Sequence, residues 1–477
     1  MGYFITYTKI YSTISSLTAY LVVLHTLHRW LQKLHPLILD TTAKIEVMSR
    51  PVTRLIGQGV RYATKLRGGG SAFPGLVMEK LHPNFVPEEL AKLPRGVVVV
   101  SGTNGKTTTT KMVVQLLESQ GLKVFTNRTG SNFVRGVAAA LLGEMSLTGK
   151  LDADIAVLEL DEAHAVHFVK KVKPTHSLLL NVLRDQLDRF GEIDTTRRML
   201  SVVAGATTNT IILNREDPRI RSLAQNAQPE TNVEYFGLSE KLRAMFPSDD
   251  DMRTADSPIN TAKLAPELPG AEVILKDFNG TQATFTLGEE EFTGTINLYG
   301  VYNIFNAAAA IALTRSIMGE QTNIAALMEE LPKITPAFGR GETLNVNGQT
   351  LQLLLVKNPS GFRLSLASAD ARDYATMITI NDQYADGRDI SWLWDVDFHS
   401  LQKGGVSMVS GVRAYDMALR LEHEDVPVAG IDENLEEALK TFIKDSNGKP
   451  MRIFCTYTAM LAIRKELSKI TDVEVIS

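Results

Sequence analysis

The chain has 477 residues, of which 44% are hydrophobic and 22% are charged, and its formal net charge is −4. This composition is typical of a globular protein with enough chain for two to four domains. The slight acidic excess provides no footprint for general nucleic-acid binding. The single cysteine, Cys455, excludes an internal disulfide framework and a cysteine-rich zinc site, and it favours a reducing, cytoplasmic setting.

Residues 1–47 differ from the rest of the chain. The stretch 10–28 contains no Asp, Glu, Lys or Arg, and Arg29 and Trp30 follow it directly. It is nearly long enough to span a bilayer, although Ser, Thr and His dilute its apolar character. No clear small-residue cleavage site marks a secretory signal. Three interpretations stay open for this extension: a membrane-associating helix, an ordinary docking helix, and an upstream extension from a misplaced start codon.

Residues 48–93 are expected to form a helical lead-in. The basic stretch 50–66 has apolar residues at roughly helical spacing, and the Gly-Gly-Gly-Ser sequence at 68–71 is a clear helix breaker. A short helix is expected over residues 88–93.

Strands and helices alternate over residues 94–335. Four consecutive valines, residues 97–100, predict a strand buried on both faces. Further strands are expected at 123–127, 155–160, 177–183 and 210–213, a hairpin at 284–287 and 293–298, helices at 136–142 and 303–317, and a loop or small insertion at 239–263. This pattern predicts an α/β domain with a largely parallel sheet, helices on both faces, and a ligand site beyond the carboxyl ends of the strands.

Residues 336–477 repeat this pattern on a smaller scale. A strand is expected at 351–356, a helix at 362–369 and a strand at 375–380, and the segments 406–410, 417–421 and 452–455 continue the alternation. We therefore predict a second, smaller Rossmann-like domain. Cys455 lies in an apolar strand with no histidine nearby in the sequence, so it is interpreted as a core residue and not as a nucleophile.

The stretch after the four valines carries the strongest chemical signal. It reads Ser-Gly-Thr-Asn-Gly-Lys-Thr over residues 101–107 and continues into a helix-compatible segment. Glycines let the backbone approach a phosphate, and successive N–H groups and the helix N-terminus stabilise the anion. Lys106 is expected to contact the β- and γ-phosphates of ATP, and the Thr107 hydroxyl to ligate Mg²⁺. The nucleotide-binding residues predicted here are Gly102, Thr103, Asn104, Gly105, Lys106, Thr107 and Thr108.

Charged side chains follow the next strands of the same domain. Glu159 ends the strand at 155–160 and is predicted to hold Mg²⁺, with Asp161 and Glu162 close by; a solvated strand-end acid is the alternative. After the following strand, alternating cations and carboxylates suit phosphate and metal positioning, or else form a surface salt-bridge ladder. These are Arg184, Asp185, Asp188 and Arg189.

Three further residues are candidate nucleotide contacts. Asn303 and Asn306 stand three residues apart on one face of a helix start, and their amides offer the donor and acceptor that suit the adenine edge. A plain helix cap is the alternative for Asn303. Arg340 lies at the presumed domain junction, from which it would reach the nucleotide or remain a solvated linker residue.

Several of these stretches resemble known ligases. The spacing G-x-x-G-K-T is tighter than in the general P-loop and is similar to that of Mur ligases and folylpolyglutamate synthases, which activate a carboxylate with ATP and join it to an amine. From about residue 95 to the end, the chain resembles the Mur ligases, and more narrowly the MurT family, the ligase subunits of lipid II isoglutaminyl synthases. The narrower resemblance is carried by 67–75, 126–136, 158–164, 184–194 and, most specifically, 381–397 (NDQYADGRDISWLWDVD).

Departures from related families refine this resemblance. Gln186 stands where amino-acid-adding Mur ligases carry a histidine metal ligand, and only Arg197 and Arg198 lie near the place of their carbamoylated lysine. MurT proteins share both differences. Many MurT proteins also hold a four-cysteine zinc ribbon, whereas residues 255–260 of this chain continue without a cysteine, so we predict no zinc site.

The resemblance implies an ATP- and Mg²⁺-dependent amidating enzyme in the cytoplasm, at the inner face of the plasma membrane. MurT proteins pair with GatD, a class I glutamine amidotransferase subunit, and use its ammonia to amidate the α-carboxylate of D-glutamate in the lipid II stem peptide. Asp389 would orient the histidine of the partner's Cys–His pair, with Asp386 and Asp395 as fallback candidates. From the residues alone, a turn cap or an ion pair with Arg388 is favoured for Asp389. The alternative functions are a stand-alone Mur- or folylpolyglutamate-type amino-acid ligase and a non-catalytic P-loop scaffold.

Overall fold

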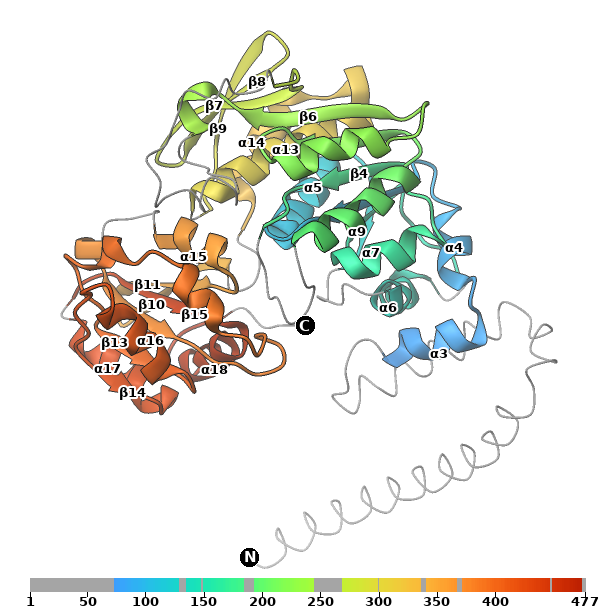
Figure 1. Ribbon diagram of the computed structural model, residues 1–477. Coiled ribbons are helices and arrows are strands. Elements are labelled where there is room, and N and C mark those ends of the chain that lie inside the picture. The colour runs from blue at the N-terminus through green and yellow to red at the C-terminus, as the bar shows by residue number, and fades with distance from the viewer. Residues whose placement is uncertain are drawn as a thin grey trace, which may run out of the picture.

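The computed structural model describes most of the chain from residue 73 onward as two α/β units (Figure 1). The described residues are 73–127, 134–146, 149–183, 193–243, 268–298, 300–335, 340–366, 371–446 and 448–473. The expectations for residues 1–47 and for a basic helix at 50–66 lie outside them. Within this described part, no helix combines the length and the apolar character needed to cross a membrane.

The first unit is built on a nine-stranded sheet with the order β2-β3-β1-β4-β5-β6-β7-β8-β9. Neighbouring strands run parallel from β2 to β7, whereas β7, β8 and β9 pair antiparallel at one edge. The strands are β1 (Val97–Ser101), β2 (Val124–Thr126), β3 (Ile155–Glu159), β4 (His176–Leu179), β5 (Thr210–Asn214), β6 (Asn232–Leu238), β7 (Val273–Asn279), β8 (Gln282–Leu287) and β9 (Glu290–Thr295). Every residue of β1 is buried, as a run of valines predicts for a central parallel strand.

Helices cover both faces of this sheet. They are α3 (Phe73–Leu81), α4 (Phe85–Leu90), α5 (Lys106–Ser119), α6 (Val134–Glu144), α7 (Glu162–Val169), α9 (Ile193–Ala206), α10 (Pro218–Arg221), α11 (Glu240–Arg243), α13 (Val301–Met318) and α14 (Ile324–Glu330), with 3₁₀ turns η2 (Ser222–Asn226), η3 (Gly319–Gln321) and η4 (Leu331–Lys333). Val98 and Val100 pack with apolar residues of α5 and α13, whereas Val97 and Val99 pack with those of α6, α7 and α9. Alternate residues of one strand therefore serve two separate cores.

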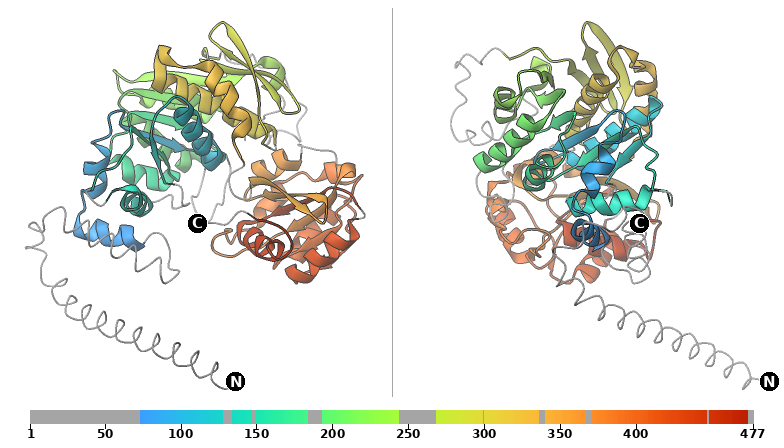
Figure 2. Two further views of the ribbon diagram at one scale, coloured as in Figure 1. Left: turned by 180° about the vertical axis from the view of Figure 1, so that it is seen from behind. Right: turned by 90° about the vertical axis from the view of Figure 1, so that its right-hand side faces the viewer.

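The second unit is a six-stranded sheet with the order β10-β11-β15-β12-β13-β14, and it forms its own lobe beside the first unit (Figure 2). Its strands are β10 (Arg340–Val346), β11 (Gln349–Leu355), β12 (Ala375–Thr379), β13 (Met408–Ser410), β14 (Ile431–Asp432) and β15 (Met451–Cys455). Its helices are α15 (Pro359–Leu366), α16 (Ala414–Glu422), α17 (Leu435–Asp445) and α18 (Tyr457–Leu467), with η5 (Ala371–Asp373), η6 (Ser391–Asp395) and η7 (His399–Leu401). Only the β10–β11 pair is antiparallel among these described strands, which agrees with the Rossmann-like prediction.

The core interpretation of Cys455 is confirmed. The thiol lies at the carboxyl end of β15 with no exposed surface, and burial raises its pKa well above the ordinary value. A thiol that stays protonated is a poor nucleophile, so Cys455 serves packing between β15 and the helices α17 and α18.

Most expected elements are present, and two kinds of difference have a physical cause. The strand expected at 177–183 is too long, because β4 ends at Leu179 and the chain then turns toward the phosphate loop, where the Asn181 carbonyl accepts the Thr103 N–H (3.0 Å). The sequence pattern also misses β6, β7 and β10, in which polar or charged residues interrupt the apolar spacing. The helix expected at 88–93 begins and ends three residues earlier, as α4.

Candidate nucleotide-binding site

The predicted phosphate loop connects the carboxyl end of β1 to the first turn of α5. Its two glycines have positive φ angles, 134° at Gly102 and 86° at Gly105, which other residues adopt only with strain. A Cβ atom added to Gly102 would lie 3.0 Å from the Asn181 backbone, and one added to Gly105 would lie 2.8 Å from the Asn306 Oδ1. Only glycine therefore fits at either position, because of the backbone conformation and because of the short distance to the neighbouring atoms. A loop that wraps closely around a phosphate needs such residues.

Lys106 lies at the centre of the loop. Its Nζ donates a hydrogen bond to the Gly102 carbonyl (2.6 Å) and forms ion pairs with Asp161 (3.2 Å) and Glu162 (3.5 Å) at the start of α7. The side chain is buried, so these partners offset the cost of removing its charge from water. The two acids thus contact the lysine, and the ammonium lies beside the loop backbone where a phosphate would be held.

Thr107 and Glu159 come together as predicted for a magnesium site. The Thr107 hydroxyl donates to the Glu159 Oε1 (2.8 Å) from the first turn of α5. The Glu159 backbone is fixed by Asn127, whose Oδ1 accepts the Glu159 N–H (3.0 Å) and whose Nδ2 donates to the Glu159 carbonyl (2.8 Å). Hydroxyl and carboxylate oxygens beside a phosphate cradle are the donor set that Mg²⁺ prefers, so these residues fit the ion.

The two asparagines of α13 are placed beside the loop. The N-cap of this helix is Gly300, so the cap alternative for Asn303 is wrong. Both side chains are buried, and the Asn306 Nδ2 donates to the Asn303 Oδ1 (3.4 Å). Because Asn306 packs against Gly105, it lies close to the phosphate end of the site, and its role toward adenine stays a prediction.

A cavity of about 150 Å³ opens between the phosphate loop and the second unit. The residues from the loop side include Asn104, Gly105, Thr108, Asn181, Asn214, Glu216, Tyr302 and Phe305, and those from the second unit are Leu355, Lys357, Asn358, Gly361 and Ser365. The sequence pattern identifies only the loop residues and Asn306. Polar residues directly after the strands at 210–213 and 351–356 are the signal that would have added Asn214, Lys357 and Asn358.

Asn181 and Asp217 also line this cavity. The Asn181 side chain clamps the loop backbone, since its Oδ1 accepts the Asn104 N–H (2.8 Å) and its Nδ2 donates to the Asn104 carbonyl (3.0 Å). The buried Asp217 accepts the N–H groups of Val182 (2.7 Å) and Arg219 (2.8 Å), while burial raises the pKa of this carboxyl. Both residues hold backbone segments in place.

Several predicted positions lie outside the described residues. They are Arg184, Asp185, Gln186, Asp188 and Arg189, together with the cysteine-free stretch 255–260. Arg340 begins β10, but its side chain also lies outside the description. The roles given to these residues, and the expected lack of zinc, stay predictions.

Known families match both units. The Mur ligase middle domain matches residues 100–314, and the MurT ligase C-terminal domain matches residues 355–460. The lipid II isoglutaminyl synthase (glutamine-hydrolyzing) subunit MurT of Streptococcus pneumoniae (strain ATCC BAA-255 / R6) is 33% identical over 443 residues, which are 87% of this chain and 96% of that protein. The chain belongs to the MurT family.

Further relatives agree with membership of the MurT family. The subunit of the same name from Staphylococcus aureus (strain COL) is 26% identical over 457 residues, which are 90% of this chain and 98% of that protein. Among solved structures, a MurF from Acinetobacter baumannii aligns with a TM-score of 0.62 at 16% identity, over 83% of this chain and 80% of that one. A pseudomurein peptide ligase type C from Methanothermus fervidus aligns with a TM-score of 0.61 at 16% identity, over 81% and 80%. These likenesses confirm the predicted Mur-ligase-like fold.

The C-terminal MurT match contains the loop that carries Asp389. This half-buried carboxylate accepts the Ser391 N–H (2.9 Å) and so closes a turn just before η6, which is the turn-cap alternative. Asp386, by contrast, is 4% exposed, and it accepts the N–H (2.7 Å) and the hydroxyl (2.5 Å) of Thr458. Asp386 therefore anchors the loop to α18. The carboxylate of this fallback candidate is used for a contact inside the chain.

Large apolar side chains are exposed around the same end of the second sheet. They are Tyr384, Trp394, Val412, Tyr415, Leu419 and Tyr457, and Tyr384 is 86% exposed. The loops after β12, β13 and β15 carry several of them, and the carboxyl ends of these parallel strands meet at one edge. An apolar surface of this kind is typical of a site for another protein.

Proposed function

We propose that the chain is the ATP-dependent ligase subunit of a lipid II isoglutaminyl synthase. It would activate the α-carboxylate of D-glutamate in the lipid II stem peptide and amidate it to D-isoglutamine, a peptidoglycan modification. The observation that carries this proposal is the 33% identity to the pneumococcal MurT subunit, which extends over 96% of that protein. The phosphate loop and the Thr107–Glu159 pair supply the matching chemistry.

The first step would be transfer of the γ-phosphoryl group of ATP to a carboxylate oxygen, which forms an acyl phosphate and releases ADP. A carboxylate needs this step because oxide is too poor a leaving group for direct attack by ammonia. The Lys106 ammonium and the N-terminus of α5 stabilise negative charge on the transferring group. Thr107 and Glu159 would hold Mg²⁺, which neutralises phosphate charge when it is bound.

The second step would be attack of ammonia on the acyl carbon. The C–N bond forms, the C–O bond to phosphate breaks, and the nitrogen loses a proton to give the amide and inorganic phosphate. The cavity between the two units is where these groups would meet, since it is lined by the loop on one side and by Lys357 and Asn358 on the other. Enclosure there limits hydrolysis of the acyl phosphate by water.

The ammonia would come from a GatD-like class I glutamine amidotransferase, because the relatives are named as subunits of glutamine-hydrolysing synthases. The apolar surface around Asp389 is the proposed docking site for this glutaminase. Asp389 would then orient the histidine of the partner's Cys–His pair, fix its tautomer and stabilise the imidazolium. With lipid II as the substrate, the reaction would take place in the cytoplasm, at the inner face of the plasma membrane.

The test is a reconstitution of the purified chain with a candidate glutaminase, glutamine, ATP, Mg²⁺ and lipid II. Amide formation that requires glutamine and is lost in Lys106→Ala is the expected result. ATP turnover driven by an amino acid without any partner would instead establish a stand-alone ligase. Unchanged amide formation in Lys106→Ala would mean that the phosphate loop has no catalytic role and that the chain is a non-catalytic scaffold.

A further inference from the structure

A reciprocal pair of asparagines joins the phosphate loop to the second unit. The Asn104 Nδ2 donates to the Asn358 Oδ1 (3.1 Å), and the Asn358 Nδ2 donates to the Asn104 Oδ1 (2.9 Å). Asn104 lies between the two loop glycines, whereas Asn358 lies in the connection from β11 to α15. Helix α15 is on the side of the second lobe that faces the first (Figure 1). The pair is therefore a bridge between the two units.

Asn358 is held rigidly on its own side of this bridge. It has no exposed surface, its Oδ1 also accepts the Gly361 N–H (2.9 Å), and its carbonyl accepts the Phe362 N–H (3.1 Å). These bonds cap the first turn of α15, with Pro359 in the first helical position. The amide that faces the loop is thus pre-oriented by a helix end.

Asn104 is held from two directions. Asn181 bonds its backbone N–H (2.8 Å) and its carbonyl (3.0 Å), while Asn358 bonds its side chain. A loop bounded by glycines has much conformational freedom to lose when it binds a phosphate. Contacts that fix the loop beforehand lower this entropic cost and strengthen binding.

We propose that Asn358 is a positioning residue that fixes the phosphate loop through Asn104 and couples nucleotide binding to docking of the second unit. The inference rests on the proposed function, since it takes ATP as the occupant of the loop. By thermodynamic linkage, nucleotide binding and domain docking then favour each other. Because Asp389 is carried by the second unit, the same bridge places the partner-facing loop relative to the site of acyl phosphate formation.

The first test separates the bridge from the helix cap. Asn358→Ser keeps an oxygen that caps α15 but cannot form the reciprocal amide pair, and we expect it to weaken the affinity of a non-hydrolysable ATP analogue about 5- to 20-fold. The matched control is Asn434→Ser, because Asn434 caps α17 by accepting the N–H groups of Glu436 (3.1 Å) and Glu437 (3.4 Å). The control should retain the wild-type affinity, and an equally strong affinity in Asn358→Ser would overturn the proposal.

A double-mutant cycle decides whether Asn358 acts through Asn104. Asn104→Ala should weaken binding of the analogue, and adding Asn358→Ser to this variant should change the affinity by less than about twofold. If the full effect of Asn358→Ser persists without the Asn104 side chain, Asn358 contacts the nucleotide directly and the positioning role is wrong.

Distances between the two units give a readout that does not depend on amide synthesis. Labels on cysteines introduced at the exposed positions Ala325 and Lys440 report on the two lobes, and the buried Cys455 is protected from labelling. The ATP analogue should narrow the distance distribution in the wild type and in Asn434→Ser but not in Asn358→Ser. Equal narrowing in all three refutes the coupling, whereas failure of the proposed function would show separately as the absence of amide product from the wild type.

Discussion

The clearest pH effect at the scale of single residues concerns His176 in β4. Burial lowers the pKa of this imidazole from 6.5 to about 4, so the unfolded chain binds more protons than the folded one between these values. The contribution of His176 to the free energy of unfolding is therefore fully present above pH 6.5. It falls by about 3 kcal/mol as the pH is lowered from 7 to 4. Urea unfolding across this range should show the slope in the wild type and a smaller slope in His176→Asn; identical slopes would contradict this assignment.

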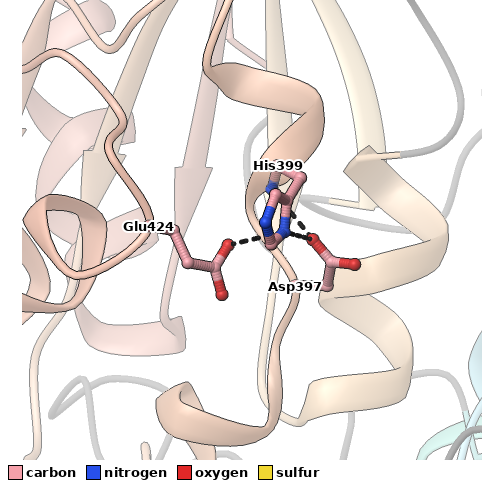
Figure 3. Close-up of side chains that lie close together, drawn as sticks. All are labelled: Asp397, His399 and Glu424. Carbon is pink, nitrogen blue, oxygen red and sulfur yellow. Dashed lines mark hydrogen bonds and ion pairs between the residues drawn. The ribbon is translucent and has the colours of Figure 1, made fainter. Parts of the chain in front are cut away.

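A second histidine shows the opposite shift. His399 is exposed, and its Nδ1 lies 2.8 Å from Asp397 and 3.4 Å from Glu424 (Figure 3). The hydrogen bond and the charge of Asp397 raise the pKa of His399 above 6.5. The ion pair therefore stabilises the fold fully below pH 6.5, and its contribution is lost as the pH rises through the folded-state pKa. An NMR titration should find the raised pKa, and Asp397→Asn should lower it while the distant Asp373→Asn does not.

Thr107 allows a test of the metal assignment with a control from its own helix. Thr107→Val removes the hydroxyl that bonds Glu159, and we expect kcat for amide formation to fall about 100-fold, with Thr107→Ser retaining most activity. In the control Thr110→Val the lost hydroxyl is buried and has no hydrogen-bond partner among the described atoms. Equal activities of Thr107→Val and Thr110→Val would show that the Thr107 hydroxyl is not a ligand of the metal ion.

What the sequence can predict at this scale depends on how local a residue's role is. Gly105, Lys106 and Thr107 act within one short turn, so their spacing alone indicates phosphate binding. Asn181 and Asn358 act on the same turn from segments that are 77 and 254 residues away from Asn104, and no local pattern marks either as a partner of the loop.

At the scale of elements, local pattern is enough to predict β1 but not β6. The valines of β1 are buried on both faces and leave one interpretation, whereas β6 reads Asn-Val-Glu-Tyr-Phe-Gly-Leu and is only partly buried along its first residues. Residues 180–183 show the reverse error. They are apolar enough to predict a continued strand, but the Asn181 carbonyl accepts the Thr103 N–H of the phosphate loop and the Val182 N–H donates to Asp217 before α10.

Substitution of Gly105, the second glycine of the phosphate loop, tests whether the strand–loop–helix element binds the nucleotide. Gly105→Ala combines a φ of 86° with a Cβ placed 2.8 Å from the Asn306 Oδ1, so we expect loss of nucleotide binding by more than about tenfold. The control is Gly121→Ala, because Gly121 also has a φ of 86° but has no atom within 4 Å of an added Cβ. Both variants should lose about 1 kcal/mol of stability to backbone strain, measured by urea unfolding. Loss of nucleotide affinity in both would assign the effect to general strain.

At the scale of the whole molecule, the sequence predicts two α/β units but not how they share a site. Alternating strands and helices define each unit by itself, because each has its own cores. The cavity between the units depends on tertiary placement of Lys357 and Asn358 opposite the phosphate loop. Strands β11, β15 and β12 run parallel, so Asn358 and the loop that carries Asp389 both follow carboxyl ends of strands at the same edge of the second sheet.

The proposed roles of the phosphate loop and of Asp389 predict that one substitution can separate the use of glutamine from amide synthesis itself. Asp389→Asn keeps the side-chain oxygen that accepts the Ser391 N–H (2.9 Å), so the loop should stay folded while the negative charge is lost. Amide formation with glutamine should then fall at least about 100-fold, whereas amide formation with free ammonium should stay close to wild type, because ammonium bypasses the partner's histidine. Asp395→Asn, at the end of η6, should retain both activities. Equal loss with both nitrogen sources in Asp389→Asn would mean that the carboxylate acts in the ligase chemistry or in folding, since a role confined to the glutaminase cannot affect ammonium.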